Sequence, residues 1–269
     1  MKKVLESFDI ADFSFVSFQH LNIFDVRSKQ RIPQNAKTAI AIIFPYYNKS
    51  TSCGNVSAYC AVADYHIVVM EQLKSIISVL QQKYPQNSFV PFVDSSPVDE
   101  VDMAVKGGLG VKGENSLLIT EKWGSFVFIG EILTDLEWDT TLCDYTYCAG
   151  CGLCAASCPG GAICKAEDTT NINRENCASF ISQKKQELTD EQKAILRRAK
   201  TVFGCDICQK VCPHNKEPLR AEEENLFSGD IFHTVTMENV EGVYKDRPFG
   251  FRGLRVLQRN LEIYNTNED

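Results

Sequence analysis

Apolar residues in the first half of the chain follow strand-like and helix-like patterns in turn. The apolar and β-branched run Thr38–Phe44, between Pro33 and Pro45, predicts a buried strand. Apolar residues then recur at helical spacing through Val56–Tyr84, which predicts a long helix that ends before Pro85. Further elements are expected as strands at Ser88–Val93, Leu117–Thr120 and Phe126–Leu133, which would complete one sheet, and as a short helix at Val98–Lys106.

This alternation predicts a layered α/β (α+β) domain that reaches to about Cys143. A cysteine-rich segment follows, in which Thr189–Gln192 has the pattern of a capping box and predicts a helix through Lys200. The remainder of the chain is typical of a short helical segment. We therefore expect three parts, at residues 1–143, 144–216 and 217–269.

Eight of the twelve cysteines fall into two blocks, and each block ends in Cys-Pro. Three closely spaced cysteines on a tight loop reach three corners of a cubane [4Fe–4S] cluster, while the fourth faces a second cluster. We therefore expect two interlocked ligand sets: Cys148, Cys151, Cys154 and Cys212 for one cluster, and Cys158, Cys177, Cys205 and Cys208 for the other. Two Zn–S4 sites are the alternative. Zinc, however, requires neither the third cysteine nor the proline of each block.

Composition narrows the class of protein. An apolar content of 44% and a charged content of 23% are typical of a soluble globular protein. The N-terminal residues lack the apolar core of a secretory signal, and no run approaches the length of a membrane span. We therefore expect a cytoplasmic protein whose cysteines are ligands rather than disulfides.

The net charge and the lack of nucleotide-binding motifs argue against further classes of protein. The net charge of −7 disfavours bulk, sequence-independent binding to nucleic acid, which depends on neutralising phosphates. Neither GxGxxG nor GxxxxGKS/T occurs, so the sequence indicates neither a Rossmann dinucleotide site nor a P-loop.

Several segments resemble, in the same order, the signatures of the epoxyqueuosine reductase family. The resemblance extends over roughly Thr38–Asn215, and the combination is far more specific than any single piece. The matching segments are GCDICQKVCPHN at 204–215, VDSSPV at 93–98, GLGVKGEN at 108–115, GEILTDL at 130–136, and Tyr59 with Asp64–His66.

This resemblance implies a cobalamin-binding domain followed by a bacterial-ferredoxin-like domain with two [4Fe–4S] clusters. It also implies an oxidoreductase that converts epoxyqueuosine to queuosine at the wobble position of tRNA. In such a reaction cob(I)alamin, supplied with electrons by the clusters, reduces the epoxide. The expected partners are the tRNA substrate and a low-potential donor such as flavodoxin or ferredoxin, with a monomeric protein and no membrane.

The resemblance further implies site residues. Asp94 matches the family's proton donor, which would protonate the departing oxygen; the alternative is a helix-capping or turn residue before Pro97. Asp64 and His66 are expected to form a hydrogen-bonded pair in the core, and Cys53, Cys60, Cys143 and Cys164 to be structural. The residues expected at the cobalamin are Ser57, Tyr59, Asp94, Leu118, Ile129, Ile132, Leu133, Asn171 and Asn173.

The chain also departs from the family pattern. Glu114 stands where the family has Lys, and Val111 where it has Trp. The family continues into a helical-repeat extension, so we expect a short form that ends at Asp269. These departures leave two other hypotheses: a corrinoid and iron–sulfur reductase of a small molecule, related to reductive dehalogenases, or a non-enzymatic iron–sulfur electron carrier.

Overall fold

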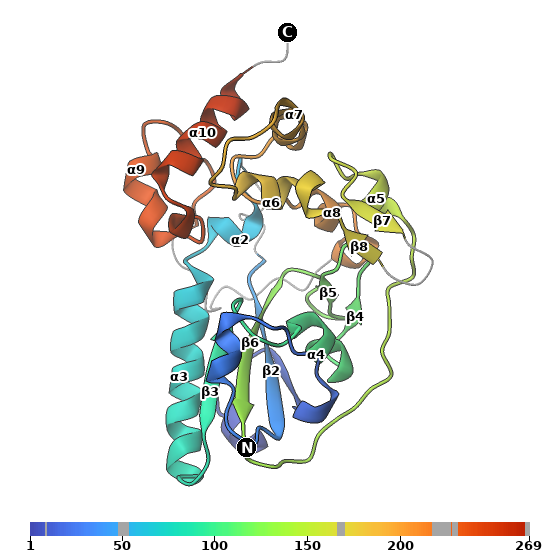
Figure 1. The fold of residues 1–269 in the computed structure, drawn as a ribbon, viewed down its shortest axis with the longest axis vertical. Coiled ribbons are helices and arrows are strands. Elements are labelled where there is room, and N and C mark those ends of the chain that lie inside the picture. The colour runs from blue at the N-terminus through green and yellow to red at the C-terminus, as the bar shows by residue number, and fades with distance from the viewer. Residues whose placement is uncertain (9, 48–53, 166–169, 217–226, 228–230, 267–269) are drawn as a thin grey trace.

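A computed structural model describes residues 1–8, 10–47, 54–165, 170–216, 227 and 231–266. The elements form two parts that are stacked along the long axis of the molecule (Figure 1). The lower part contains the N-terminus, a sheet and the long helix α3 (Tyr65–Lys83), and the upper part contains the cysteine-rich segment and the C-terminal helices. The mixed α/β class expected from the sequence is confirmed.

The central sheet has four strands in the order β1–β2–β6–β3, and every neighbouring pair is antiparallel. Its strands are β1 (Asp12–Ser17), β2 (Thr38–Pro45), β3 (Phe89–Val93) and β6 (Val127–Thr134). Both faces of β2 and β6 are buried, which explains why these strands are continuous apolar runs in the sequence. The strands expected at 38–44, 88–93 and 126–133 are confirmed.

One strand prediction fails, and one strand of the central sheet was not predicted. The expected strand at Leu117–Thr120 does not join the central sheet, because β5 (Leu118–Ile119) pairs with β4 (Val111–Lys112) in a separate hairpin. Strand β1 was not predicted, although polar and apolar residues alternate in its first four positions, DFSF. Strand β6 lies between β2 and β3, so the last strand of the sheet in sequence is central in space.

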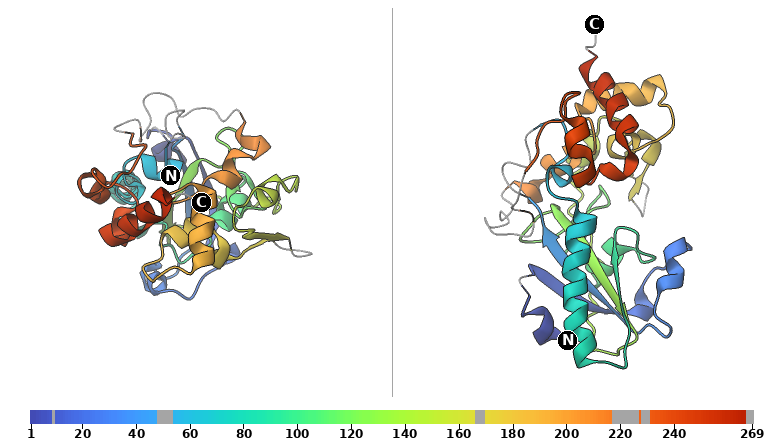
Figure 2. Two further views of the ribbon diagram at one scale, coloured as in Figure 1. Left: turned by 90° about the horizontal axis from the view of Figure 1, so that it is seen from above. Right: turned by 90° about the vertical axis from the view of Figure 1, so that its left-hand side faces the viewer.

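Helices cover both faces of this sheet. Helix α3 runs along one face (Figure 2), and the short helix α4 (Glu100–Lys106) packs on the other. The buried stripe of α3 recurs at helical spacing and consists of Val69, Leu73, Ile76 and Leu80. The sheet is therefore the middle layer of the lower part, and the turns at its upper end face the cysteine-rich segment.

The long helix expected over Val56–Tyr84 is interrupted. Helix α2 (Ala58–Ala61) ends before Asp64, whose side chain accepts a hydrogen bond from the backbone N–H of His66 and caps α3. A capping aspartate offers the backbone an alternative to a continuous helix, so the apolar period alone did not reveal this break.

The upper part begins with the cysteine-rich segment. Its elements are α5 (Leu153–Ala156), β7 (Ile163–Lys165), β8 (Thr170–Ile172), α6 (Ala178–Ser182), α7 (Asp190–Ala199) and α8 (Ile207–Lys210). The predicted capping box of α7 is confirmed, because Thr189 and Gln192 exchange hydrogen bonds between side chain and backbone.

The C-terminal segment is helical, as expected. Its helices α9 (Val240–Val243) and α10 (Leu254–Asn265) pack against Val56, Cys60 and Phe203, so one apolar cluster joins all three expected parts of the chain. None of the helices within the described residues combines the length and apolar character needed to cross a membrane. The shorter helical elements are α1 (Lys2–Leu5), η1 (Phe18–His20), η2 (Arg27–Arg31), η4 (Arg174–Asn176), η5 (Pro213–Asn215), η6 (Tyr244–Asp246) and η7 (Gly250–Arg252).

Candidate active site and cluster-binding cysteines

Asp94 lies where β3 ends and the chain turns toward α4. Its backbone φ is +58°, in the left-handed region that favours glycine, so surrounding contacts must hold this residue in place. Its side chain is 61% exposed. Asp94 lines both an outer groove of about 730 Å³, whose wall includes Arg27 and Arg31, and an inner cavity of about 100 Å³. Asp94 therefore borders two spaces that a ligand could enter.

A histidine joins Asp94 to a second aspartate. His66 Nδ1 lies 2.7 Å from Asp64 Oδ1, and His66 Nε2 lies 3.5 Å from Asp94 Oδ2. Burial opposes the charged imidazolium, but hydrogen bonds and charges from the two aspartates outweigh burial and raise the His66 pKa to about 9. The ring also stacks on Tyr65, with 4.0 Å between ring centroids. His66 is therefore a fixed cation beside Asp94 at neutral pH.

The contacts of His66 differ from the sequence prediction in one respect. Asp64 and His66 do pair, as expected, but the pair is not sealed in the core, because 32% of the His66 side chain is exposed and its second nitrogen faces Asp94. The first turn of α3 positions Asp64, Tyr65 and His66 together, and the end of β3 supplies Asp94. This contact between distant segments could not be read from residue spacing.

The inner cavity has an apolar wall and an acidic end. Leu118, Phe128 and Ile129 belong to the wall, and Asp94 and Glu100 to the acidic end. Burial, followed by the charges of Glu131 and Asp94, raises the pKa of Glu100 well above its usual value. The cavity volume of about 100 Å³ is below the roughly 300–1,000 Å³ of small-molecule sites, so these residues could border one part of a corrin ring but do not enclose it.

The other expected cobalamin contacts are placed differently from Leu118 and Ile129. Ile132 and Leu133 are fully buried on opposite faces of the sheet and line neither the inner cavity nor the outer groove. Ser57 is buried where the chain meets the cysteine-rich segment, and its N–H donates to the Phe203 carbonyl at 2.9 Å. Tyr59 contacts Tyr65 edge-on, with 6.4 Å between ring centroids.

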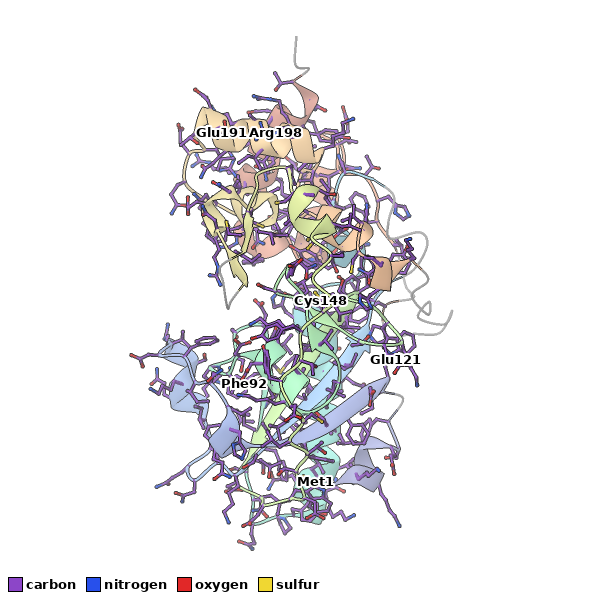
Figure 3. All side chains as sticks on the ribbon, turned by 90° about the vertical axis from the view of Figure 1, so that its right-hand side faces the viewer. Met1, Phe92, Glu121, Cys148, Glu191 and Arg198 are labelled. Atoms are coloured by element: carbon purple, nitrogen blue, oxygen red, sulfur yellow. The ribbon has the colours of Figure 1, made fainter. Side chains whose placement is uncertain are left out.

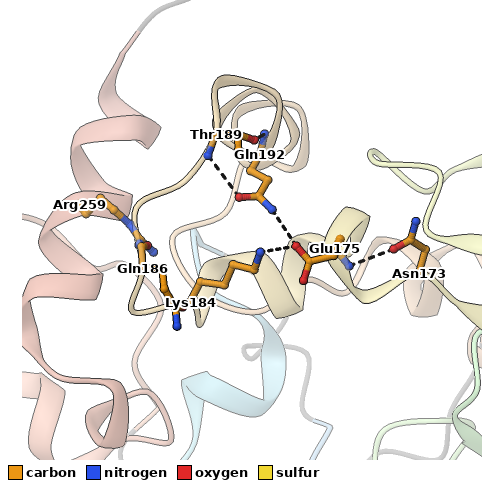
Figure 4. Close-up of polar contacts among 7 residues, drawn as sticks. All are labelled: Asn173, Glu175, Lys184, Gln186, Thr189, Gln192 and Arg259. Carbon is orange, nitrogen blue, oxygen red and sulfur yellow. Dashed lines mark hydrogen bonds and ion pairs between the residues drawn. The ribbon is translucent and has the colours of Figure 1, made fainter.

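The segment that contains Asn171 and Asn173, two further expected cobalamin contacts, lies in the upper part of the molecule. The exposed Asn173 caps a helical turn by accepting a hydrogen bond from the Glu175 N–H at 3.1 Å (Figure 4). Glu175 in turn pairs with Lys184 and accepts from Gln192 at 3.2 Å. Asn173 therefore has a structural contact of its own, whereas the side chain of Asn171 lies outside the described residues.

The described thiols form two groups of neighbours. Cys212 interacts electrostatically with Cys148 and Cys151, and Cys154 interacts with Cys148. In the second group, Cys205 interacts with Cys158 and Cys177, and Cys208 with Cys177 and Cys205. These groups contain the same residues as the two expected ligand sets, and the assignment of ligands stays a prediction.

The surroundings of these thiols suit iron–sulfur ligands. Burial raises the pKa of Cys205 to about 11 and of Cys208 to about 12, so neither thiol ionises readily without a bound metal. Backbone N–H groups point at the sulfurs, as where the Ala162 N–H donates to Cys158 Sγ at 3.2 Å. Across the described residues, no three or more His, Cys, Asp or Glu side chains are arranged to hold a single metal ion.

Glu114 contacts the first group of cysteines, and Asn115 contacts the second. The carboxylate of Glu114, which is buried, accepts from the Gly152 N–H at 3.1 Å and lies 4.0 Å from Cys154 Sγ. The Asn115 side chain hydrogen bonds to the Cys208 thiol. The turn between β4 and β5 therefore lies between the two groups. Glu114 places a carboxylate beside Cys154 at the position where the resembling family has Lys.

Polar residues between the cysteines attach the upper part to the sheet. Asn215 accepts from the Ser125 N–H at 2.8 Å, and Gln209 accepts from the Ser125 hydroxyl at 2.9 Å. Asp206 accepts from the Ala58 N–H at 2.6 Å. All of these groups are buried. Asp206, Gln209 and Asn215 occur within the cysteine-containing signature at 204–215, but the sequence alone did not indicate this role.

The remaining cysteines are only partly as expected. Cys60 is buried and accepts a hydrogen bond from the Ser57 hydroxyl, which agrees with a structural role. Cys143 and Cys164 are exposed, so burial does not support the structural role expected of either. Cys53 lies outside the described residues.

Two family models match the chain. One is described as a 4Fe-4S double cluster binding domain and matches residues 147–215. The other is described as epoxyqueuosine reductase QueG and matches residues 27–95. Together they include the expected cluster cysteines, Asp94 and the helix that contains His66.

Several similar proteins are named epoxyqueuosine reductase. An epoxyqueuosine reductase of Cyclobacterium marinum is 35% identical over 90% of this chain and 81% of its own length. An epoxyqueuosine reductase of Leadbetterella byssophila is 32% identical over 89% of this chain and 81% of its own length. A crystal structure of epoxyqueuosine reductase with an epoxyqueuosine-modified tRNA stem loop is 22% identical. It superposes with a TM-score of 0.76 over 98% of this chain and 80% of that one, so the two share a fold.

Proposed function

The chain belongs to the epoxyqueuosine reductase family, and we propose that it reduces epoxyqueuosine to queuosine at the wobble position of tRNA. The observation that carries this proposal is the juxtaposition of Asp94, His66 and Asp64 beside two hollows in a chain of this family. The groove and the cavity both border Asp94, so a substrate and a cofactor could each reach its carboxylate.

The enzyme is an oxidoreductase whose cofactors are two [4Fe–4S] clusters and cobalamin. Cobalamin, when bound, supplies the low-potential two-electron chemistry that an epoxide requires, and the clusters deliver electrons one at a time. In our proposal Cys148, Cys151, Cys154 and Cys212 hold one cluster. Cys158, Cys177, Cys205 and Cys208 hold the other. Leu118 and Ile129 would form part of the apolar wall against the corrin ring.

The cluster held by the first set is the better candidate to receive electrons from outside. Cys151 of that set is exposed, whereas burial strongly raises the pKa of Cys205 and Cys208 in the second set. We therefore propose that electrons pass from the first set to the second and on toward the cavity beside Asp94.

Asp94 would act as the general acid. Conversion of the epoxide to an alkene consumes two electrons and two protons, and the oxygen leaves as water. A bare alkoxide is a poor leaving group, so a proton donor must reach the oxygen as the carbon–oxygen bond breaks. The Asp94 carboxyl would deliver this proton from the end of β3. His66, a cation at neutral pH, would stabilise the Asp94 carboxylate that remains once its proton has been delivered, and Asp64 holds the imidazole ring in place.

The division into a catalytic part at 1–143, a cluster part at 144–216 and a helical segment at 217–269 is part of this proposal. The buried contacts of Asp206, Gln209 and Asn215 support it, because they would keep the clusters at a fixed distance from the sheet. A flavodoxin or ferredoxin donor and a monomeric state stay predictions.

The test is a nucleoside assay. Anaerobically prepared protein that carries both cofactors is incubated with epoxyqueuosine-containing tRNA and dithionite or reduced flavodoxin, and the digested nucleosides are analysed. We expect conversion to queuosine, and unchanged epoxyqueuosine would reject the proposed substrate. Asp94→Asn should retain both cofactors and lose turnover by on the order of 100- to 10,000-fold, the range typical of a general acid. Full turnover in this variant would remove Asp94 from the role.

A further inference from the structure

The segment that carries Asp94 is conformationally demanding. Asp94 itself is in the left-handed region, and the next residue turns sharply, with the Ser95 N–H 2.6 Å from the Val93 carbonyl. A non-glycine residue stays in this conformation only where contacts around it offset the strain. Since the Asp94 side chain is 61% exposed, packing around it contributes little to its position. Contacts elsewhere in the turn must therefore hold Asp94 beside His66.

Glu131 supplies such a contact from the middle of the sheet. It lies on β6 between Ala41 of β2 and Phe92 of β3, and its side chain is fully buried. Burial raises its pKa to about 8, although the hydrogen bond from Ser96 opposes this shift, so the carboxyl is mostly neutral at pH 7. A buried carboxyl in the central strand adds nothing to an apolar core, which suggests a role outside packing.

Ser96 connects this carboxyl to the Asp94 turn. Its hydroxyl donates to Glu131 Oε2 at 2.6 Å and accepts from the Val98 N–H at 3.0 Å. A single hydroxyl thus ties the end of the turn both to the central strand and to the approach to α4. The second carboxyl oxygen of Glu131 has no hydrogen-bond partner among the described residues.

We infer that the Ser96–Glu131 hydrogen bond is a latch that positions Asp94 against His66. This inference deepens the proposed function, because it assigns a positioning role for the proposed acid. Ser96 and Glu131 do not touch the substrate in this scheme; they act through the conformation of residues 94–97. The competing explanation is a buried polar pair that contributes only to folding stability.

The two explanations differ in what they predict for His66. Contact with Asp94 is one cause of the raised His66 pKa, and the Asp64 contact is the other. If the latch is lost and Asp94 moves away, the His66 pKa should fall toward its value in Asp94→Asn. If the pair is merely structural, the folded protein should retain the wild-type His66 pKa.

The experiment titrates His66 by NMR of histidine-labelled holoprotein and requires no substrate. Ser96→Ala should lower the His66 pKa, and Ser96→Thr, which keeps the hydroxyl, should restore it. Glu131→Gln keeps an acceptor and should leave it near the wild-type value. An unchanged His66 pKa in folded Ser96→Ala overturns the latch, whether or not epoxyqueuosine proves to be the substrate.

Ser88→Ala is a matched control. Its hydroxyl donates to Asp135 Oδ2 at 3.1 Å, so the variant loses a similar hydroxyl–carboxyl contact at the opposite end of β3. We expect no change in the His66 pKa, and a change equal to that of Ser96→Ala would also overturn the inference. If turnover is confirmed, Ser96→Ala should lower kcat by on the order of 10- to 100-fold, with little change in KM. A matching loss in Ser88→Ala would refute the positioning role.

Discussion

Replacement of Glu114 by Gln should raise the reduction potential of the cluster held by Cys148, Cys151, Cys154 and Cys212. The Glu114 carboxylate is 8% exposed and lies 4.0 Å from Cys154 Sγ. Reduction adds a negative charge to the cluster, and a neighbouring carboxylate disfavours this addition. Gln removes the charge but keeps a carbonyl oxygen that can accept the Gly152 N–H, so the loop should retain its geometry.

Coulomb's law sets the size of the effect. Two unit charges 4 Å apart interact by about 4 kcal/mol at an effective dielectric constant near 20. The added electron is shared by the whole cluster, so a separation of roughly 8 Å is more appropriate and gives about 2 kcal/mol. Since 1.4 kcal/mol corresponds to 59 mV for one electron, the expected shift is about +90 mV.

A redox titration followed by electron paramagnetic resonance measures this potential. Glu191→Gln is the control, because Glu191 pairs with Arg198 on α7, well away from Cys148 (Figure 3). Iron content must stay at four atoms per cluster, so that a changed potential is not mistaken for cluster damage. No shift in Glu114→Gln, or a shift to lower potential, would refute the electrostatic reasoning; Glu114→Lys should shift further upward.

Three other predictions test separate features. Cys154→Ser should lower the iron content by about half and retain the resonance signal of the second cluster; complete loss of iron would contradict two separate ligand sets. Glu131 has a folded pKa near 8 against about 4.5 unfolded, so its contribution to stability is present below pH 4.5 and lost as pH rises through 8. The free energy of unfolding of Glu131→Gln should therefore rise relative to that of the parent across this pH range, by up to about 5 kcal/mol. Thermal inactivation measured against pH follows this difference, and a difference that stays constant with pH would contradict the raised pKa. Asn215→Leu leaves the buried Ser125 N–H without its acceptor and removes the amide that donates to the Ser125 hydroxyl, although this hydroxyl keeps Gln209 as its acceptor. The variant should therefore be less stable by about 1–3 kcal/mol and lose its clusters faster, as followed by visible absorbance; an unchanged rate would show that this contact does not hold the cluster segment.

Local features of this protein could be predicted from the sequence because short-range chemistry determines them. The spacing of the eight cysteines indicated cubane clusters, and Thr189–Gln192 indicated the start of α7, since capping depends on residues three positions apart. The apolar runs of β2 and β6 indicated buried strands. Asp94 was recognised only through a family resemblance, because an aspartate before Pro97 is equally typical of a turn.

The tertiary structure decided which distant residues meet. The insertion of β6 between β2 and β3 places Glu131 beneath Ser96, and the break before α3 turns His66 toward Asp94. Neither contact has a sequence signal, because strand order and helix packing depend on burial summed over the whole sheet rather than on local spacing. The sequence alone therefore determined the cofactor class. The arrangement of the acid, its histidine and its latch is a property of the fold.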